Sequence, residues 1–297
     1  MAVNTIAYAE KYASELDKAL VQKSVTGFLA DNVLKAQFVG AKTVKIPNID
    51  FVGLVDYDRD NGFNRAAVTV ANEAFTMAMD RARSIQIDRE DMDETGVASL
   101  AGKILGEYVR TKVAPECDAY ILSKLAGVAN TNSNTVAWDE TKPFEVFNKL
   151  MTNVQNVAGF DEELVAFVDG NAYAALMNSP EFTRSITTSD FKKGEVDMKV
   201  KSINGVALIP VTPDRMKTAF NFKGEAGGFT PDGSAKAIHM LVLPKKAASL
   251  VKKTEKMRVF SPEQNLDADA YKFDYRVYYD VFVKKSHLKT VWGAFGA

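Results

Sequence analysis

The sequence is poor in the residue types that most often support catalysis and metal binding. Its 297 residues include one cysteine, Cys117, and two histidines, His239 and His287. A single cysteine excludes an intrachain disulfide and is compatible with a reducing compartment. A zinc site needs three or four ligands, and the sequence has no cluster of cysteine and histidine that could supply them. Since His239 lies in an apolar run, we expect it to be a core residue with its polar atoms satisfied.

Excess charge of one sign and long apolar runs are also missing. Lysine and arginine total 37 against 38 aspartates and glutamates, which gives a formal net charge of -1. The chain therefore lacks the basic field of a dedicated nucleic-acid-binding protein, and any contact with DNA should be weak and non-specific. No stretch approaches the roughly 18 apolar residues of a membrane helix. The N-terminus has no signal-peptide pattern, so we expect a soluble protein made in the cytoplasm, with no membrane partner.

Motifs for catalysis or ligand binding are absent or incomplete. Three aspartates alternate in residues 56–60, but the sixth and twelfth positions of an EF-hand loop would hold Asn61 and Ala67 instead of Gly and Glu. The acidic run 88–94 could hold a catalytic carboxylate pair, although such clusters are more typical of a solvated face or a partner surface. There is no phosphate-binding loop and no G-x-S-x-G elbow. We therefore predict no catalytic residue, no cofactor and no metal ligand, hence a protein that is not an enzyme.

The first third of the chain indicates extended structures that lack a core of their own. Residues 4–35 have a narrow apolar stripe at helical spacing, which is typical of a docking arm. Alternation in residues 42–46 predicts a strand that ends at Pro47. Two more alternating runs, residues 66–79 and 81–91, predict the strands of a long hairpin. This hairpin has no large continuous apolar face, so it needs another surface to lie on.

The middle of the chain indicates a mixed α/β unit that follows a long helix. Helical spacing predicts a helix over residues 97–125, with a kink or break at Pro115, because proline removes one backbone hydrogen bond. A second helix is expected over residues 143–158, with Gly159 just past its end. A short buried strand then leads to Asp169, which we expect to cap the next helix.

Two strand patterns follow in the last third. Asn204-Gly205 predicts the tight turn of a hairpin between two apolar runs, and residues 237–244 indicate a buried strand. In residues 271–283 every second residue is aromatic or valine and the residues between them are mixed, which predicts a long strand with one aromatic face. The charge also changes sign along the chain. Asp56 to Glu94 contains ten acidic residues and five arginines, whereas Lys236 to Lys289 contains twelve basic and six acidic residues.

The order of these parts resembles the major capsid proteins of tailed bacteriophages, which have the Hong Kong ninety-seven type fold also used by encapsulin shells. No single motif carries the resemblance, which lies in the succession of elements over roughly residues 10–295. It implies an α+β fold with an N-terminal arm, an extended E-loop hairpin, a long spine helix, a peripheral β domain and an axial α/β domain. The implied bounds are the arm at 1–39, the first peripheral strand at 40–53, the E-loop at 54–95, the spine helix and peripheral domain at 96–134, the axial domain at 135–250 and the peripheral return strands at 251–297.

The resemblance also implies a function. A chain of this kind self-assembles, as pentamers and hexamers, into the icosahedral shell that encloses a double-stranded DNA genome, and its location is the virion capsid. If the chain is complete, the strand near Gly40 leaves no room for an internal scaffolding segment, which implies a separate scaffolding protein, together with a portal. The alternatives are an encapsulin-type compartment around a protein cargo and a tail structural protein.

Opposite charges on the hairpin and the last third would then face each other across subunits, which favours correct register and association. The alternative is that both patches are merely solvated. The residues that we expect at this contact are Asp80, Asp88, Glu90, Asp91, Asp93 and Glu94 on the hairpin side and Lys245, Lys246, Lys252, Lys253 and Lys256 on the basic side.

Overall fold

A seven-stranded sheet forms the centre of the body. Its middle strands carry apolar side chains on both faces, so both faces of the sheet must be covered. The computed structural model describes residues 24–32, 37–39, 42–57, 59, 69–89, 106–180, 186–193, 196–224 and 227–296. Strand order in this sheet is β5-β15-β12-β6-β9-β8-β7. The strands are β5 (Thr135–Ala137), β6 (Leu164–Asp169), β7 (Ile186–Lys193), β8 (Val196–Ile203), β9 (Val206–Val211), β12 (Ile238–Pro244) and β15 (Trp292–Phe295).

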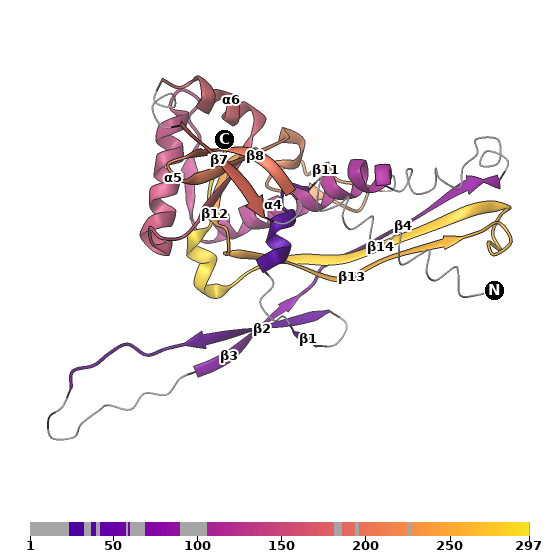
Figure 1. Cartoon of the computed structure of the whole chain (residues 1–297), viewed down its shortest axis with the longest axis horizontal. Coiled ribbons are helices and arrows are strands. Elements are labelled where there is room, and N and C mark those ends of the chain that lie inside the picture. The colour runs from indigo at the N-terminus through magenta and orange to yellow at the C-terminus, as the bar shows by residue number, and fades with distance from the viewer. Residues whose placement is uncertain are drawn as a thin grey trace.

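Helices cover both faces of this sheet (Figure 1). Helices α5 (Pro143–Ala158) and α6 (Gly170–Asn178) share one buried cluster with alternate residues of β6 and β12, among them Phe147 and Val168. Helix α4 (Ala114–Thr131) shares a second cluster with the intervening residues, among them Leu122 and Phe167. Burial on both faces explains why β6 and β12 are continuous apolar runs instead of alternating ones.

Local sequence signals in the body are confirmed. Gly159 follows α5 with a positive φ of 93°. Asp169 caps α6 by accepting a 2.6 Å hydrogen bond from the backbone N–H of Ala172. Asn204 and Gly205, with φ of 50° and 80°, form the turn between β8 and β9.

Pro115 interrupts α-helical hydrogen bonding, as expected. Residues Val109–Val113 form a π-helical segment directly before α4, and the N–H of Ala114 donates to the carbonyl of Val109. Pro115 then stands in the first turn of α4, where its missing N–H costs least. The helix continues to Thr131, beyond the predicted end, while the expected residues 97–105 lie outside the described part.

Two extensions leave the body in different directions (Figure 1). The first is a three-stranded sheet in the order β1-β2-β3, and the second is a long ribbon in the order β13-β14-β4. The strands are β1 (Gln37–Val39), β2 (Thr43–Asp50), β3 (Thr69–Thr76), β4 (Met79–Asp88), β13 (Ala248–Phe260) and β14 (Ala270–Val283). The aromatic face predicted for residues 271–283 is confirmed in β14, and the structure shows that Phe273, Tyr275 and Tyr279 on this face are buried.

The predicted pairing of residues 66–79 with 81–91 is wrong. β3 pairs with β2, from Thr43 opposite Thr76 to Asp50 opposite Thr69. β4 pairs instead with β14, from Met79 opposite Tyr279 to Asp88 opposite Ala270. The hairpin therefore consists of β2 and β3, and the chain passes from it into the ribbon through Met77 and Ala78 alone.

Pro47 does not end β2, contrary to expectation. It lies inside the strand, opposite Asn72 of β3. Among the described residues, the pairing of β2 with β1 runs from Thr43 to Lys45. At Pro47 the strand thus has one described neighbour, and a proline is tolerated at such an edge position. Of the arm expected at residues 4–35, the described part contains the short 3-10 helix η1 (Gly27–Asn32), which packs beside β13.

Candidate assembly interface

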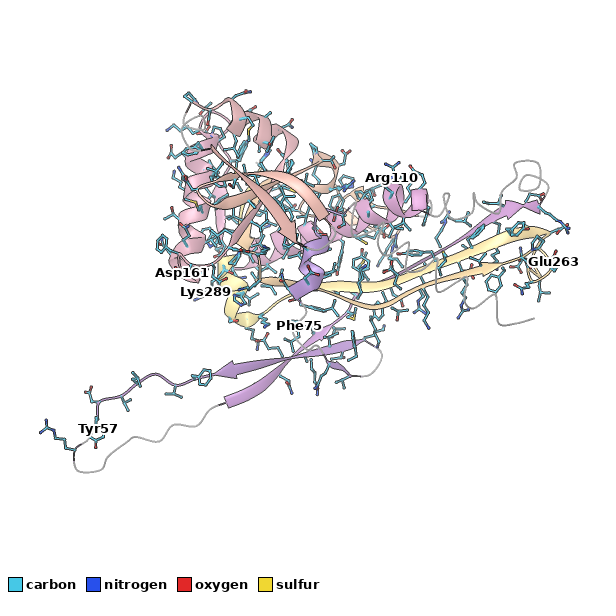
Figure 2. The ribbon with its side chains drawn as sticks, viewed as in Figure 1. Tyr57, Phe75, Arg110, Asp161, Glu263 and Lys289 are labelled. Atoms are coloured by element: carbon cyan, nitrogen blue, oxygen red, sulfur yellow. The ribbon has the colours of Figure 1, made fainter. Side chains whose placement is uncertain are left out.

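The β2–β3 hairpin carries an exposed apolar segment away from the body. Phe51, Val52, Leu54, Val55 and Tyr57 follow β2 in sequence, and their exposed fractions run from 61% to 105%. Figure 2 shows Tyr57 at the far end of this extension. Soluble monomers rarely present so much contiguous apolar surface, and such surfaces mark contacts with other molecules.

The base of the hairpin is packed firmly on the ribbon. Val44, Ile46 and Met77 form a small buried cluster with Tyr278 and Phe282 of β14. Phe75 of β3 joins this cluster, with its ring centroid 4.8 Å from that of Phe282. The exposed tip is therefore displayed from an anchored base.

One face of the ribbon is buried under α4, whereas the other is buried against the hairpin base at Tyr278 and Phe282 and is polar further along the strand. Tyr275 and Tyr279 point to the buried face, whereas Arg276 lies on the polar face and forms a bidentate ion pair with Asp80 of β4, at 2.9 and 2.6 Å. The hydrogen bond from Arg276 lowers the pKa of Asp80 from its ordinary value. The ribbon thus offers a charged surface beside an apolar hairpin.

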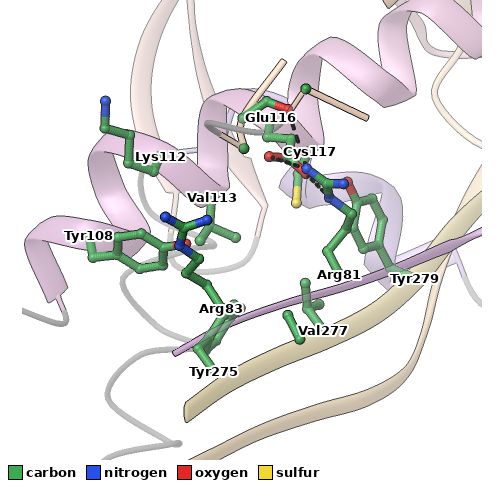
Figure 3. Close-up of a pocket in the computed structure, with 14 residues that line it drawn as sticks. Arg81, Arg83, Tyr108, Lys112, Val113, Glu116, Cys117, Tyr275, Val277 and Tyr279 are labelled. Atoms are coloured by element: carbon green, nitrogen blue, oxygen red, sulfur yellow. Dashed lines mark hydrogen bonds and ion pairs between the residues drawn. The ribbon is translucent and has the colours of Figure 1, made fainter. Parts of the chain in front are cut away.

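A cavity of about 490 Å³ lies between β4 and the helical segment before α4 (Figure 3). Arg81 spans it, donating to Glu116 at 2.6 Å and to the backbone carbonyl of Phe222 at 2.6 Å. Cys117, at the inner end, is buried, and burial raises the pKa of its thiol to about 12. Because the reactive form of cysteine is the thiolate, this geometry supports structure and not nucleophilic catalysis.

His239 is partnered, as expected for a core histidine. Its Nδ1 lies 2.9 Å from Oδ2 of Asp169, and its ring stacks on Trp138 with centroids 4.8 Å apart. In the part of the chain that the structure describes, no three His, Cys, Asp or Glu side chains group closely enough to hold a metal ion. None of its helices is both long and apolar enough to span a membrane.

Comparison with known proteins identifies the architecture. No family profile and no curated protein sequence matches the chain. Among solved structures, the mature capsid of bacteriophage PhiM1 matches with a TM-score of 0.56 and 16% identity, covering 86% of this chain and 82% of the other. The capsid of cyanophage P-SCSP1u matches with a TM-score of 0.57 and 14% identity, covering 88% and 85%. The chain has the fold of phage capsid proteins.

A virus-like particle from Pyrococcus furiosus shares this capsid fold. It matches with a TM-score of 0.55 and 11% identity, over 97% of this chain and 99% of the other. These matches confirm the mixed helix and strand fold of phage capsid proteins, which the order of elements in the sequence predicted, while the division into arm, E-loop, spine helix and two domains stays a prediction. At these identities the likeness is one of fold.

The residues predicted at a contact between subunits fall into three groups. Glu90, Asp91, Asp93 and Glu94 lie outside the described residues. Asp88 is exposed at the end of β4, and Lys246 and Lys256 are exposed near and on β13.

The third group is Asp80, Lys245, Lys252 and Lys253, whose interactions within the chain are as follows. Asp80 pairs with Arg276, as above, and Lys245 lies 2.7 Å from Glu163. Lys252 lies 3.2 Å from Glu255, and Lys253 stands over the ring of Phe38 at 5.7 Å. Sequence reasoning missed the apolar tip, although its signal was present in the apolar residues of F-V-G-L-V beside D-Y-D-R-D.

Proposed function

We propose that this chain is a major capsid protein, a shell subunit that assembles with copies of itself around the double-stranded DNA genome of a tailed phage. The observation that carries the proposal is the apolar hairpin tip, residues 51–57, displayed by a chain that has the capsid fold. The side chains of Phe51, Val52, Leu54 and Val55 are 66% to 105% exposed in the single chain. In the proposed shell a neighbouring subunit covers them.

The elements take the following roles in this proposal. The β2–β3 hairpin is the E-loop, and α4 with the π-helical segment before it is the spine helix. The ribbon β13-β14-β4 is the peripheral domain, and the seven-stranded sheet with α5 and α6 is the axial domain. The E-loop then lies on the adjacent subunit of the same ring, since a head-to-tail contact closes into a ring when the rotation allows it.

Charge complementarity suggests a second contact between subunits, separate from the β2–β3 hairpin, because Asp88 lies at the end of the ribbon strand β4. The acids at Asp88, Glu90, Asp91, Asp93 and Glu94 would meet lysines of a neighbour, with Lys246 and Lys256 being the exposed candidates on the described surface. Such contacts contribute to register and association rate more than to affinity. The apolar tip supplies the larger part of the contact energy, because burial of apolar area is the main favourable term in association.

The proposed role is structural and not enzymatic. The cavity of Figure 3 is crossed by an ion pair, and its cysteine is held as a neutral thiol. The partners are further copies of the chain, a separate scaffolding protein, a portal and, weakly, packaged DNA. The location is the virion capsid, assembled in the cytoplasm of a bacterial host.

A second candidate is a shell around a protein cargo. It is favoured by the virus-like particle from Pyrococcus furiosus, which matches over 97% of this chain. The contents of purified particles separate the two candidates: nuclease-protected DNA supports a genome shell, and a co-purifying protein in fixed ratio supports a cargo shell.

Size-exclusion chromatography of the purified protein, with negative-stain microscopy of the largest fraction, tests the proposal. Closed shells, or rings of five or six subunits, are expected. A protein that stays monomeric over a wide concentration range, with crowding agent and with the neighbouring phage gene products, would contradict it.

A further inference from the structure

A buried carboxylate joins the spine of the molecule to the base of the hairpin. Asp280 of β14 is fully buried. Its Oδ1 accepts hydrogen bonds from Tyr120 at 2.9 Å, from Lys124 at 2.5 Å and from the backbone N–H of Val281 at 2.7 Å. Its Oδ2 accepts from the backbone N–H of Ala78 at 2.9 Å. A buried charge needs this degree of pairing, because its removal from water is otherwise very costly.

Among the groups that donate to Asp280, Ala78 is the one that connects it to the hairpin. It is one of the two residues between the hairpin strand β3 and the ribbon strand β4. The other, Met77, donates its N–H to the carbonyl of Lys42 at 2.8 Å and accepts from Tyr278 at 3.2 Å. Hinges are a few residues at the ends of elements. Here the two candidate hinge residues, Met77 and Ala78, are both held by hydrogen bonds.

A second route runs from α4 to the hairpin through ring contacts. The Nζ atom of Lys124 lies 5.0 Å from the ring centroid of Phe282. Phe282 in turn packs against Phe75 of β3, with centroids 4.8 Å apart. Burial, reinforced by Asp280, raises the pKa of Tyr120, so its hydroxyl stays a donor. Lys124 therefore contacts the hairpin base by a polar path and by an apolar path.

We propose that Lys124 is a positioning residue for assembly, which acts through Asp280 to hold the hairpin in one direction relative to α4. This rests on the proposed function, since the direction matters only if the tip must reach a neighbouring subunit. A hairpin that already points in one direction loses less conformational entropy when it binds a neighbour. More of the free energy from burying the apolar tip then remains as binding free energy.

The chain offers a matched control in a second buried carboxylate on α4. Asp118 is also fully buried and accepts from Ser24 at 2.5 Å, Thr26 at 2.6 Å and Arg215 at 2.9 Å. No hydrogen bond described for it reaches the hairpin. Asp118→Asn therefore perturbs a comparable polar group without touching the hinge.

Distance measurement between two spin labels tests the proposal on unassembled subunits. One label is placed at Leu54→Cys on the tip and one at Thr152→Cys on the exposed side of α5. The buried Cys117 should not take the label. The parent protein should give one narrow distance peak, Lys124→Met and Tyr120→Phe should lose it, and Asp118→Asn should keep it. Two variants are used so that a folded one is at hand if the other fails to fold.

A narrow, parent-like peak in either folded hinge variant would overturn the proposal. Shell yield is measured separately, and Lys124→Met should form fewer closed shells. Normal yield despite a lost peak would overturn the role in assembly. If the parent protein itself forms no shells, the proposed function fails, whereas the distance measurement on free subunits still reports on the hinge.

Discussion

Truncation of Leu54 at the hairpin tip should weaken assembly without weakening the subunit. The side chain is fully exposed in the isolated chain, at 105% of its reference area. Leu54→Ala therefore removes no contact from the subunit, and its midpoint of thermal unfolding should not change. In a shell the same side chain would be buried against a neighbour.

The magnitude follows from the buried area. Leucine to alanine removes three carbons, and burial contributes about 0.8 kcal/mol for each, so about 2 kcal/mol is lost per contact. Each subunit of a closed ring extends one hairpin and receives one, so the loss counts once per subunit. Since 1.4 kcal/mol is a factor of ten, the threshold concentration for assembly should rise by about 30-fold.

Light scattering against protein concentration measures this threshold. Leu54→Met is the control, because it keeps nearly the same apolar volume and should assemble close to the parent threshold. A threshold for Leu54→Ala equal to that of the parent, with the same unfolding midpoint, would refute the reasoning. It would mean that the tip stays in solvent in the particle.

Four further predictions concern the body and the charged surfaces. Phe147→Ala should lower the free energy of unfolding by about 3–5 kcal/mol in urea denaturation, because Phe147 of α5 is fully buried in the cluster that α5 shares with β6 and β12; a loss well below 1 kcal/mol would contradict that packing. Asp169→Ala should cost about 1–2 kcal/mol by removing the cap of α6, and Asp169→Asn should recover part of it; equal losses would argue against the cap. Cys117 should resist a thiol reagent at about pH 8 in the native protein and react once unfolded, because its pKa of about 12 keeps it protonated; fast native labelling would show that it is accessible as thiolate. Lys246→Glu combined with Lys256→Glu should reduce particle yield while the subunit stays folded; a normal yield would remove these lysines from the contact.

Features decided by neighbours in sequence were predictable. The cap at Asp169 and the Asn204-Gly205 turn depend on backbone geometry within a few residues, and both are confirmed. The interruption at Pro115 belongs to the same class, since a missing N–H disturbs the helix wherever the fold places it. Continuous apolar runs likewise identified β6 and β12 as strands buried on both faces.

Features that depend on residues far away in the sequence were not predictable. Alternation identifies a strand but not the strand beside it, so β3 and β4 looked like two arms of one hairpin. They are separate because β3 pairs with β2 whereas β4 pairs with β14, a strand near the other end of the chain. Pro47 was misjudged for the same reason, because the extent of β1 decides whether a proline is tolerated in β2. The apolar tip was overlooked because polar turn residues surround it.

Electron cryomicroscopy of the assembled particle tests the central claim most directly. The account predicts a closed icosahedral shell in which residues 51–57 of each subunit are covered by an adjacent copy. A particle that is an open tube, or a closed shell in which this segment projects into solvent, would contradict it.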